Sequence, residues 1–76
     1  MKITLYGTKI CPACNKAKDF FKQHSLVYDY KEVGNDISVE DYVDKTGMTS
    51  VPYIEIDDKS VHGFNAITLS RILKLN

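Results

Sequence analysis

The two cysteines of this chain, Cys11 and Cys14, are the residues best suited to chemistry, and they lie in the segment "TKICPACNKAK". Two residues separate them, which is the Cys-X-X-Cys spacing. Such a pair can form a structural disulfide, hold a metal ion, or act as two thiols of which the first attacks a disulfide and the second completes the exchange. Composition and position distinguish these three possibilities.

Composition disfavours a structural disulfide. Small secreted domains that depend on disulfides usually carry four or more cysteines, and this chain has two among 76 residues. Closing a ring of about four residues would also stabilise the fold by only about 2 kcal/mol. The segment "MKITLYG" lacks the unbroken apolar run of a secretory signal, and no apolar stretch is long enough to span a membrane. We therefore expect a cytoplasmic protein without a membrane partner, in a compartment that keeps thiols reduced.

Size and charge restrict the function further. A chain of 76 residues supports one hydrophobic core, so we expect a single domain over residues 1–76. Ten Lys and Arg residues balance ten Asp and Glu residues, and the basic residues are scattered along the chain. Nucleic acid is therefore not expected as a partner, because its recognition requires a clustered basic surface.

The sequence around the cysteines predicts a strand followed by a helix. Polar and apolar residues alternate in "KITLY", which indicates a strand over residues 2–6. After Pro12 the apolar residues recur at helical spacing, which indicates an amphipathic helix over residues 12–24. Pro12 suits the first turn of a helix, because the N–H that proline lacks would have no partner there. Cys11 is then expected at the N-cap of this helix.

The N-cap position favours the thiolate form of Cys11. Unpaired N–H groups and the positive end of the helix dipole stabilise an anion, so we expect them to lower the pKa of the Cys11 thiol. Cys14 lies one turn further on, and burial against the sheet is expected to keep its pKa higher. Lys9 can add positive charge near the thiolate or meet an anionic substrate, although a solvated loop lysine is the alternative. The pattern predicts an attacking thiol at Cys11 and a resolving thiol at Cys14.

The rest of the chain predicts further strands and helices. They are a strand over 26–33, a helix from Ser38 to near Lys45, a hairpin with strands at 52–56 and 60–63, and a last helix that is capped by Asn65 and runs to Leu75. The last helix is expected to bury an apolar stripe of Ile67, Leu69, Ile72, Leu73 and Leu75. A strand, helix and strand in succession should pair in parallel through a right-handed crossover. The order strand, helix, strand, helix, strand, strand, helix therefore predicts an α/β fold with a four-stranded mixed sheet flanked by three helices.

Four segments together resemble the glutaredoxin family of the thioredoxin-fold superfamily. They are "ITLY", the motif "CPAC" at a helix start, "SVP" before the hairpin and "HGFN" before the last helix. The resemblance implies a thioredoxin-like (glutaredoxin) fold whose first strand lies between the second and the third. It also implies a dithiol glutaredoxin, an oxidoreductase that reduces protein disulfides and glutathione mixed disulfides. Glutathione is then the reducing co-substrate, and no tightly bound cofactor is expected.

The resemblance also implies roles for particular residues. The two cysteines are the catalytic pair, and Pro52 follows a cis peptide bond and packs beside them. The backbone of Val51 pairs with the cysteinyl part of glutathione, while Lys9 and the turn from Gly63 to Asn65 meet its carboxylates. The full set expected to bind substrate or glutathione is Lys9, Pro12, Ala13, Val51, Pro52, Gly63, Phe64 and Asn65.

Departures from the glutaredoxin pattern indicate an alternative partner. Many glutaredoxins have "CPYC" and a "GG-x-D" turn, whereas this chain has Ala13 in the motif and His62 and Asn65 in the turn. "MKITLY" and "GF" resemble instead the NrdH-redoxins, which donate electrons to ribonucleotide reductase and are reduced by thioredoxin reductase. Their motif is usually "CVQC"-like, so Pro12 favours the glutaredoxin side. The expected partners of a monomer are glutathione and disulfide-containing proteins, with ribonucleotide reductase as a candidate.

Metal binding is the alternative from a different class. Small copper-carrying domains also place Cys-X-X-Cys after a first strand, but they end in a strand and have Met where this chain has Lys9. A tetrahedral zinc site would need His24 and His62, which nothing in the spacing brings together. An iron–sulfur cluster shared by two glutaredoxin molecules would use Cys11, and Pro12 argues against it. No metal ligand is therefore assigned.

Overall fold

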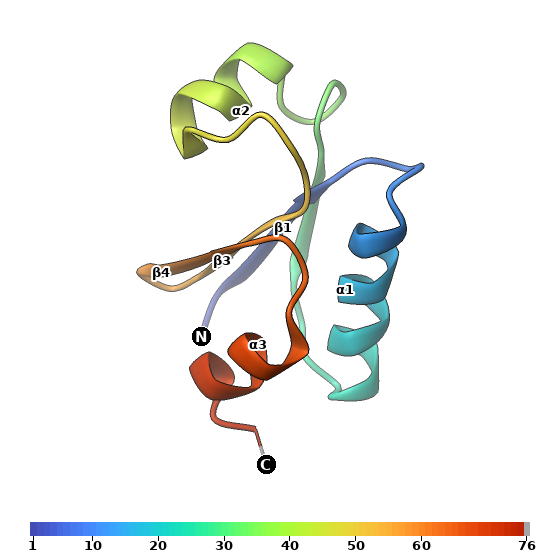
Figure 1. Cartoon of the computed structure of the whole chain (residues 1–76), viewed down its shortest axis with the longest axis vertical. Helices are drawn as coiled ribbons and strands as arrows, with labels where there is room; N and C mark the ends of the chain where they lie inside the picture. Colours follow the sequence, from blue (N-terminus) through green and yellow to red (C-terminus); the bar gives the residue numbers. More distant parts are fainter. Residues whose placement is uncertain (76) are drawn as a thin grey trace.

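The computed structural model describes residues 1–75, and these residues form seven elements in the predicted order (Figure 1). The elements are β1 (Ile3–Gly7), α1 (Pro12–Gln23), β2 (Asp29–Glu32), α2 (Val39–Thr46), β3 (Tyr53–Ile56), β4 (Lys59–His62) and α3 (Ala66–Leu73). The sheet order is β2-β1-β3-β4, in which β1 and β2 are parallel and the other neighbours are antiparallel. The predicted mixed sheet, with its first strand between the second and the third, is confirmed. Within the same 75 residues, no helix has the length and apolar character needed to cross a membrane.

The helices cover the two faces of the sheet unequally. Figure 1 shows α1 and α3 on one face and α2 on the other. The core lies between the sheet and the helices α1 and α3, where Leu5, Phe21, Ile54 and Leu69 are fully buried. On the opposite face α2 contributes one buried residue, Tyr42. The central strand β1 is therefore buried along its whole length, since side chains on both of its faces are covered.

The second strand is shorter than the sequence predicts. β2 lacks the first three residues of the strand expected over 26–33, because those residues follow a cap of α1. The N–H of Leu26 donates to the Phe21 carbonyl (2.9 Å), and that of Ser25 donates to the Lys22 carbonyl (3.1 Å). Ser25 takes the left-handed conformation, with φ of 54°. These two bonds form a Schellman cap, so the alternating pattern from Leu26 was wrong about where pairing begins.

The last helix also differs from its prediction. α3 ends at Leu73 and not at Leu75, because Lys74 takes the left-handed conformation with φ of 57°. Ile67 is 67% exposed, so its place in the predicted apolar stripe was wrong. At about 100° per residue, Ile67 lies roughly 200° around the helix from the buried Leu69. Its side chain therefore points away from the core.

The caps of α2 and α3 agree with the sequence. The Ser38 Oγ accepts a hydrogen bond from the Asp41 N–H (3.0 Å), and the Asn65 Oδ1 accepts one from the Thr68 N–H (3.0 Å). Gly47 ends α2 in the left-handed conformation, with φ of 72°. Because each bond joins residues a few positions apart, local sequence is sufficient to predict where these two helices begin.

Tyr6 projects from β1 on the side of α2, and its hydroxyl makes the stability of the fold vary with pH in the alkaline range. Its hydroxyl donates to the Glu55 Oε1 (3.1 Å). Burial, and then the Glu55 carboxylate, raise the pKa of Tyr6 from 10.0 to about 12. Below pH 10 the phenol is protonated in the folded and the unfolded chain, so its contribution to stability is complete. Between pH 10 and 12 only the unfolded chain ionises, and the stability from Tyr6 is lost.

We expect Tyr6 to lower the free energy of unfolding by about 2 to 3 kcal/mol between pH 10 and pH 12. The Tyr6→Phe variant cannot ionise at this position, so its stability should fall less steeply over the same range. It starts from a lower stability at pH 7, because it lacks the hydrogen bond to Glu55. Urea unfolding at a series of pH values measures both slopes, and equal slopes would contradict this assignment.

Candidate active site

Cys11 forms the N-cap of α1, as predicted. Its backbone is extended, with φ of −115° and ψ of 106°, and Pro12 begins the helix. The N–H of Cys14 donates to the Cys11 Sγ at 3.1 Å. A donor aimed at the sulfur and the positive end of the helix both stabilise negative charge there. The geometry therefore favours the thiolate of Cys11 when the pair is reduced.

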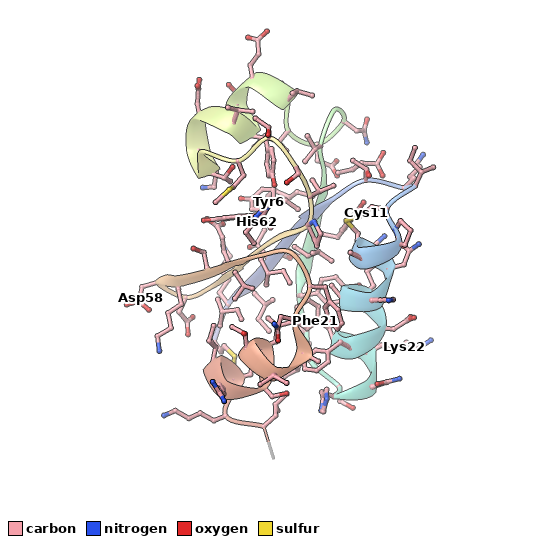
Figure 2. The ribbon with its side chains drawn as sticks, in the orientation of Figure 1. Tyr6, Cys11, Phe21, Lys22, Asp58 and His62 are labelled. Atoms are coloured by element: carbon pink, nitrogen blue, oxygen red, sulfur yellow. A yellow bond between two sulfur atoms is a disulfide. The ribbon has the colours of Figure 1, made fainter. Side chains whose placement is uncertain are left out.

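The two cysteines form a disulfide and differ in exposure. Cys14 is 0% exposed, whereas Cys11 is half-buried. Figure 2 shows Cys11 at the beginning of α1, at the end of the helix that is remote from α3. Part of Cys11 is therefore open to solvent, while Cys14 is completely covered. An attacking and a resolving thiol require this asymmetry.

Gly7 lies directly against Cys14. A Cβ at position 7 would be 2.9 Å from the Cys14 Sγ and 3.1 Å from the Cys14 Cβ, which is closer than a side chain tolerates. The ring of Tyr30 comes within 3.4 Å of the same point. Only glycine at the end of β1 therefore allows Cys14 to pack on the strand in this position. The strand predicted over 2–6 stops short of Gly7. A glycine in the sequence does not by itself reveal which side chain packs against it.

The strand register brings Pro52 to the same place. Continued by one residue, the antiparallel register of β1 and β3 puts Gly7 opposite Pro52. Pro52 is buried, and the Val51–Pro52 peptide bond is cis, as the resemblance implied. Cys14 and Pro52 are therefore both neighbours of Gly7, although they are far apart in the sequence.

The turn after β4 reaches the site through Gly63. The N–H of Gly63 donates to the Pro52 carbonyl at 2.8 Å. Phe64 packs edge-on against Phe20 of α1, with ring centroids 5.9 Å apart, and so lies against the core. Asn65 uses its side chain to cap α3. The structure thus joins Gly63 to Pro52, while it directs Phe64 toward α1.

The other predicted site residues surround Cys11 or precede Pro52. Lys9 and Pro12 are exposed, and Ala13 and Val51 are half-buried. Ile10, which sequence reasoning does not single out, is 92% exposed. An apolar side chain so exposed next to the half-buried Cys11 is available to contact a bound substrate.

Tyr42, Ser50 and His62 fix the segment before Pro52. The Tyr42 hydroxyl donates to the Ser50 carbonyl (2.7 Å), and the Ser50 Oγ lies 2.7 Å from the His62 Nε2. Burial raises the pKa of Tyr42 above its ordinary value, which favours the protonated hydroxyl that donates this bond. From the sequence, His62 is considered only as a departure from glycine and as a rejected zinc ligand, and no site role is assigned to Tyr42 or Ser50. Their partners lie 8 and 12 residues away and meet only in the fold.

The two histidines are occupied by separate contacts. His24 packs at a tilted angle against Phe20, with ring centroids 4.5 Å apart, at the far end of α1 from Cys11. His62 contacts Ser50. In the part of the chain that the structure describes, no group of three or more His, Cys, Asp or Glu side chains is placed to hold a metal ion.

Comparison with known proteins agrees with this fold and this cysteine pair. The family model described as Glutaredoxin matches residues 3–61. An uncharacterized glutaredoxin-like 8.6 kDa protein in the rubredoxin operon of Clostridium pasteurianum is 27% identical over 73 residues, which cover 95% of this chain and 97% of that protein.

Two solved structures share the fold. The glutaredoxin of Archaeoglobus fulgidus has a TM-score of 0.82 at 23% identity, and the match covers 96% of this chain and 86% of that one. The NrdH-redoxin of Escherichia coli, a glutaredoxin-like protein, has a TM-score of 0.82 at 21% identity, with 95% of each chain covered. With the match of residues 3–61 and a Cys-X-X-Cys pair at Cys11 and Cys14, this chain belongs to the glutaredoxin family of thiol redox proteins.

Proposed function

We propose that the protein is a dithiol glutaredoxin, which reduces protein disulfides and glutathione mixed disulfides and is itself reduced by glutathione. The observation that supports this most is the half-buried Cys11 at a helix N-cap, backed by a fully buried Cys14. We propose that the protein acts as a monomer in the cytoplasm. The cytoplasm is proposed because two thiols that must return to the reduced state need a reducing compartment.

Reduction of a protein disulfide begins at Cys11. Its thiolate attacks one sulfur of the substrate disulfide, and the other substrate sulfur leaves as a thiolate that takes up a proton from water. The product is a mixed disulfide between Cys11 and the substrate. The N–H of Cys14 and the positive end of α1 stabilise the thiolate before the attack.

Cys14 then resolves the mixed disulfide. Its thiol gives up a proton, its sulfur attacks the Cys11 Sγ, and the second substrate sulfur leaves as a thiol. The substrate has gained two electrons, and the cysteine pair is oxidised to the disulfide present in the structure. Two glutathione molecules complete the cycle: the first forms a mixed disulfide with Cys11, and the second releases it as glutathione disulfide.

Residues around the pair are proposed to align the substrate. Val51 offers its backbone N–H and C=O beside the cis bond, where an extended cysteinyl segment can pair with them. Lys9 and the turn from Gly63 to Asn65 are proposed to meet the carboxylates of glutathione, with Pro12 and Ala13 beside the attacking sulfur. The exposure of Lys9 and Asn65 is compatible with this role.

An NrdH-redoxin role is the second candidate. His62 and Asn65 replace residues typical of glutathione-binding glutaredoxins, and the Escherichia coli NrdH-redoxin shares the fold over 95% of this chain. In this role the protein would receive electrons from thioredoxin reductase and donate them to ribonucleotide reductase. The same cysteine chemistry serves both candidates, so the reductant distinguishes them.

We expect glutathione to reduce the oxidised protein faster than thioredoxin reductase does. The measurement follows NADPH consumption with the oxidised protein and either glutathione plus glutathione reductase or thioredoxin reductase alone. Each assay is repeated without the protein as its control. Faster turnover with thioredoxin reductase would favour the NrdH-redoxin role, and no turnover with either would contradict both candidates.

A further inference from the structure

The segment from Ser50 to Pro52, which joins α2 to β3, must be rigid if it is to align a substrate. It lies outside the regular helices and strands, and Ser50 itself is exposed. Backbone in such a segment is held only by individual hydrogen bonds and packing. The contacts of this segment therefore decide how its central residue, Val51, is presented.

The first contact comes from α2. Tyr42 is fully buried, and its hydroxyl donates to the Ser50 carbonyl at 2.7 Å. Its ring packs against the rings of Tyr6 and Tyr53, with centroids 5.7 Å and 6.5 Å away. Because these rings restrict the side chain, the hydroxyl has a fixed position from which to hold the carbonyl before Val51.

The other contacts come from β4 and the turn that follows it. The Ser50 Oγ lies 2.7 Å from the His62 Nε2, and the N–H of Gly63 donates to the Pro52 carbonyl at 2.8 Å. The residues on both sides of Val51 are thus tied to neighbouring elements. Within residues 1–75, neither the N–H nor the C=O of Val51 takes part in a hydrogen bond.

We propose that Tyr42, Ser50 and His62 form a clamp that holds the free backbone groups of Val51 in the orientation that pairs with a disulfide substrate. These three are positioning residues, since they act through Val51 and not on the reacting sulfur. The inference rests on the proposed function, in which the substrate pairs with Val51. A loosened clamp weakens substrate binding and leaves the chemistry of Cys11 intact.

The test compares Tyr42→Phe and His62→Ala with the parent protein in reduction of a glutathionylated peptide, coupled to glutathione and glutathione reductase. Each variant should raise KM by roughly three- to tenfold, as expected for loss of one hydrogen bond, with kcat changed less than about twofold. His62→Gln should restore most of the KM, because its amide can still bond to the Ser50 hydroxyl. Thr49→Ala, an exposed neighbour in the same loop, is the matched control and should match the parent.

A second measurement separates positioning from damage to the cysteine site. The rate at which iodoacetamide alkylates Cys11 in the reduced protein should be the same in parent and variants. A parent that does not reduce the peptide contradicts the proposed function, whatever the variants do. If the parent is active and KM is unchanged in both variants, the clamp is contradicted and the proposed function is not. The same conclusion follows if the variants lose alkylation rate by the same factor as they lose activity. If thermal melting shows that Tyr42→Phe is unfolded, the comparison of His62→Ala with His62→Gln decides the outcome, because the side chain of His62 is exposed.

Discussion

Replacing Cys11 with serine is expected to abolish disulfide reduction, lowering the rate by about a thousandfold or more. A serine hydroxyl at the N-cap can accept the N–H of Cys14 as the sulfur does, so the helix should still form. It cannot form a disulfide with the substrate, however, and the first covalent step is lost. A thousandfold loss corresponds to about 4 kcal/mol of barrier.

The measurement is turnover of a glutathionylated peptide and of a protein disulfide, with the folded state of the variant checked by circular dichroism. Both activities should fall to the level of the assay without protein. Substantial activity in Cys11→Ser would mean that Cys14 attacks directly, which its complete burial argues against. That result would overturn the assignment of the attacking thiol.

Replacing Cys14 is expected to separate the two activities. A glutathione mixed disulfide needs Cys11 alone, because a second glutathione can release the first from the protein. A protein disulfide needs both thiols, since the trapped substrate must be expelled by a neighbouring sulfur. We expect reduction of the glutathionylated peptide to persist within about tenfold, while reduction of the protein disulfide falls by about a hundredfold or more.

Two variants make this test robust. Serine at position 14 places a hydroxyl in a fully buried site against Gly7, so Cys14→Ala serves as the apolar control for loss of stability. Mass spectrometry should detect a lasting mixed disulfide between Cys11 and the protein substrate in both variants. Equal loss of the two activities in a folded Cys14→Ala protein would show that the division of roles is wrong.

The N-terminal caps of the three helices are encoded locally, and for that reason they could be predicted. Proline suits the first turn of a helix, so Pro12 and the helical periodicity after it place the cap at Cys11. Ser38 and Asn65 accept bonds from N–H groups three residues away, so a short window of sequence contains both partners. The order of elements and the parallel pairing of β1 with β2 follow from similarly general rules.

Local patterns failed where the fold used a residue for something other than its intrinsic preference. Leu26 belongs to an alternating stretch, yet its N–H completes the cap of α1. Ile67 is apolar, yet its angle around α3 turns it to solvent. The cis bond before Pro52 was implied by the family resemblance alone, because an isolated proline favours the trans form.

By itself, therefore, the sequence determined the reactive pair: its residue types and spacing lie within Cys11–Cys14, and its place at a helix start follows from Pro12 and the helical periodicity after it. Only the tertiary structure decided what surrounds that pair. Gly7 meets Cys14 because β1 runs beneath α1, and Tyr42 and His62 meet Ser50 because separate elements converge there. Such contacts join residues that packing and strand register bring together, and their residue types alone do not reveal which partner each one meets.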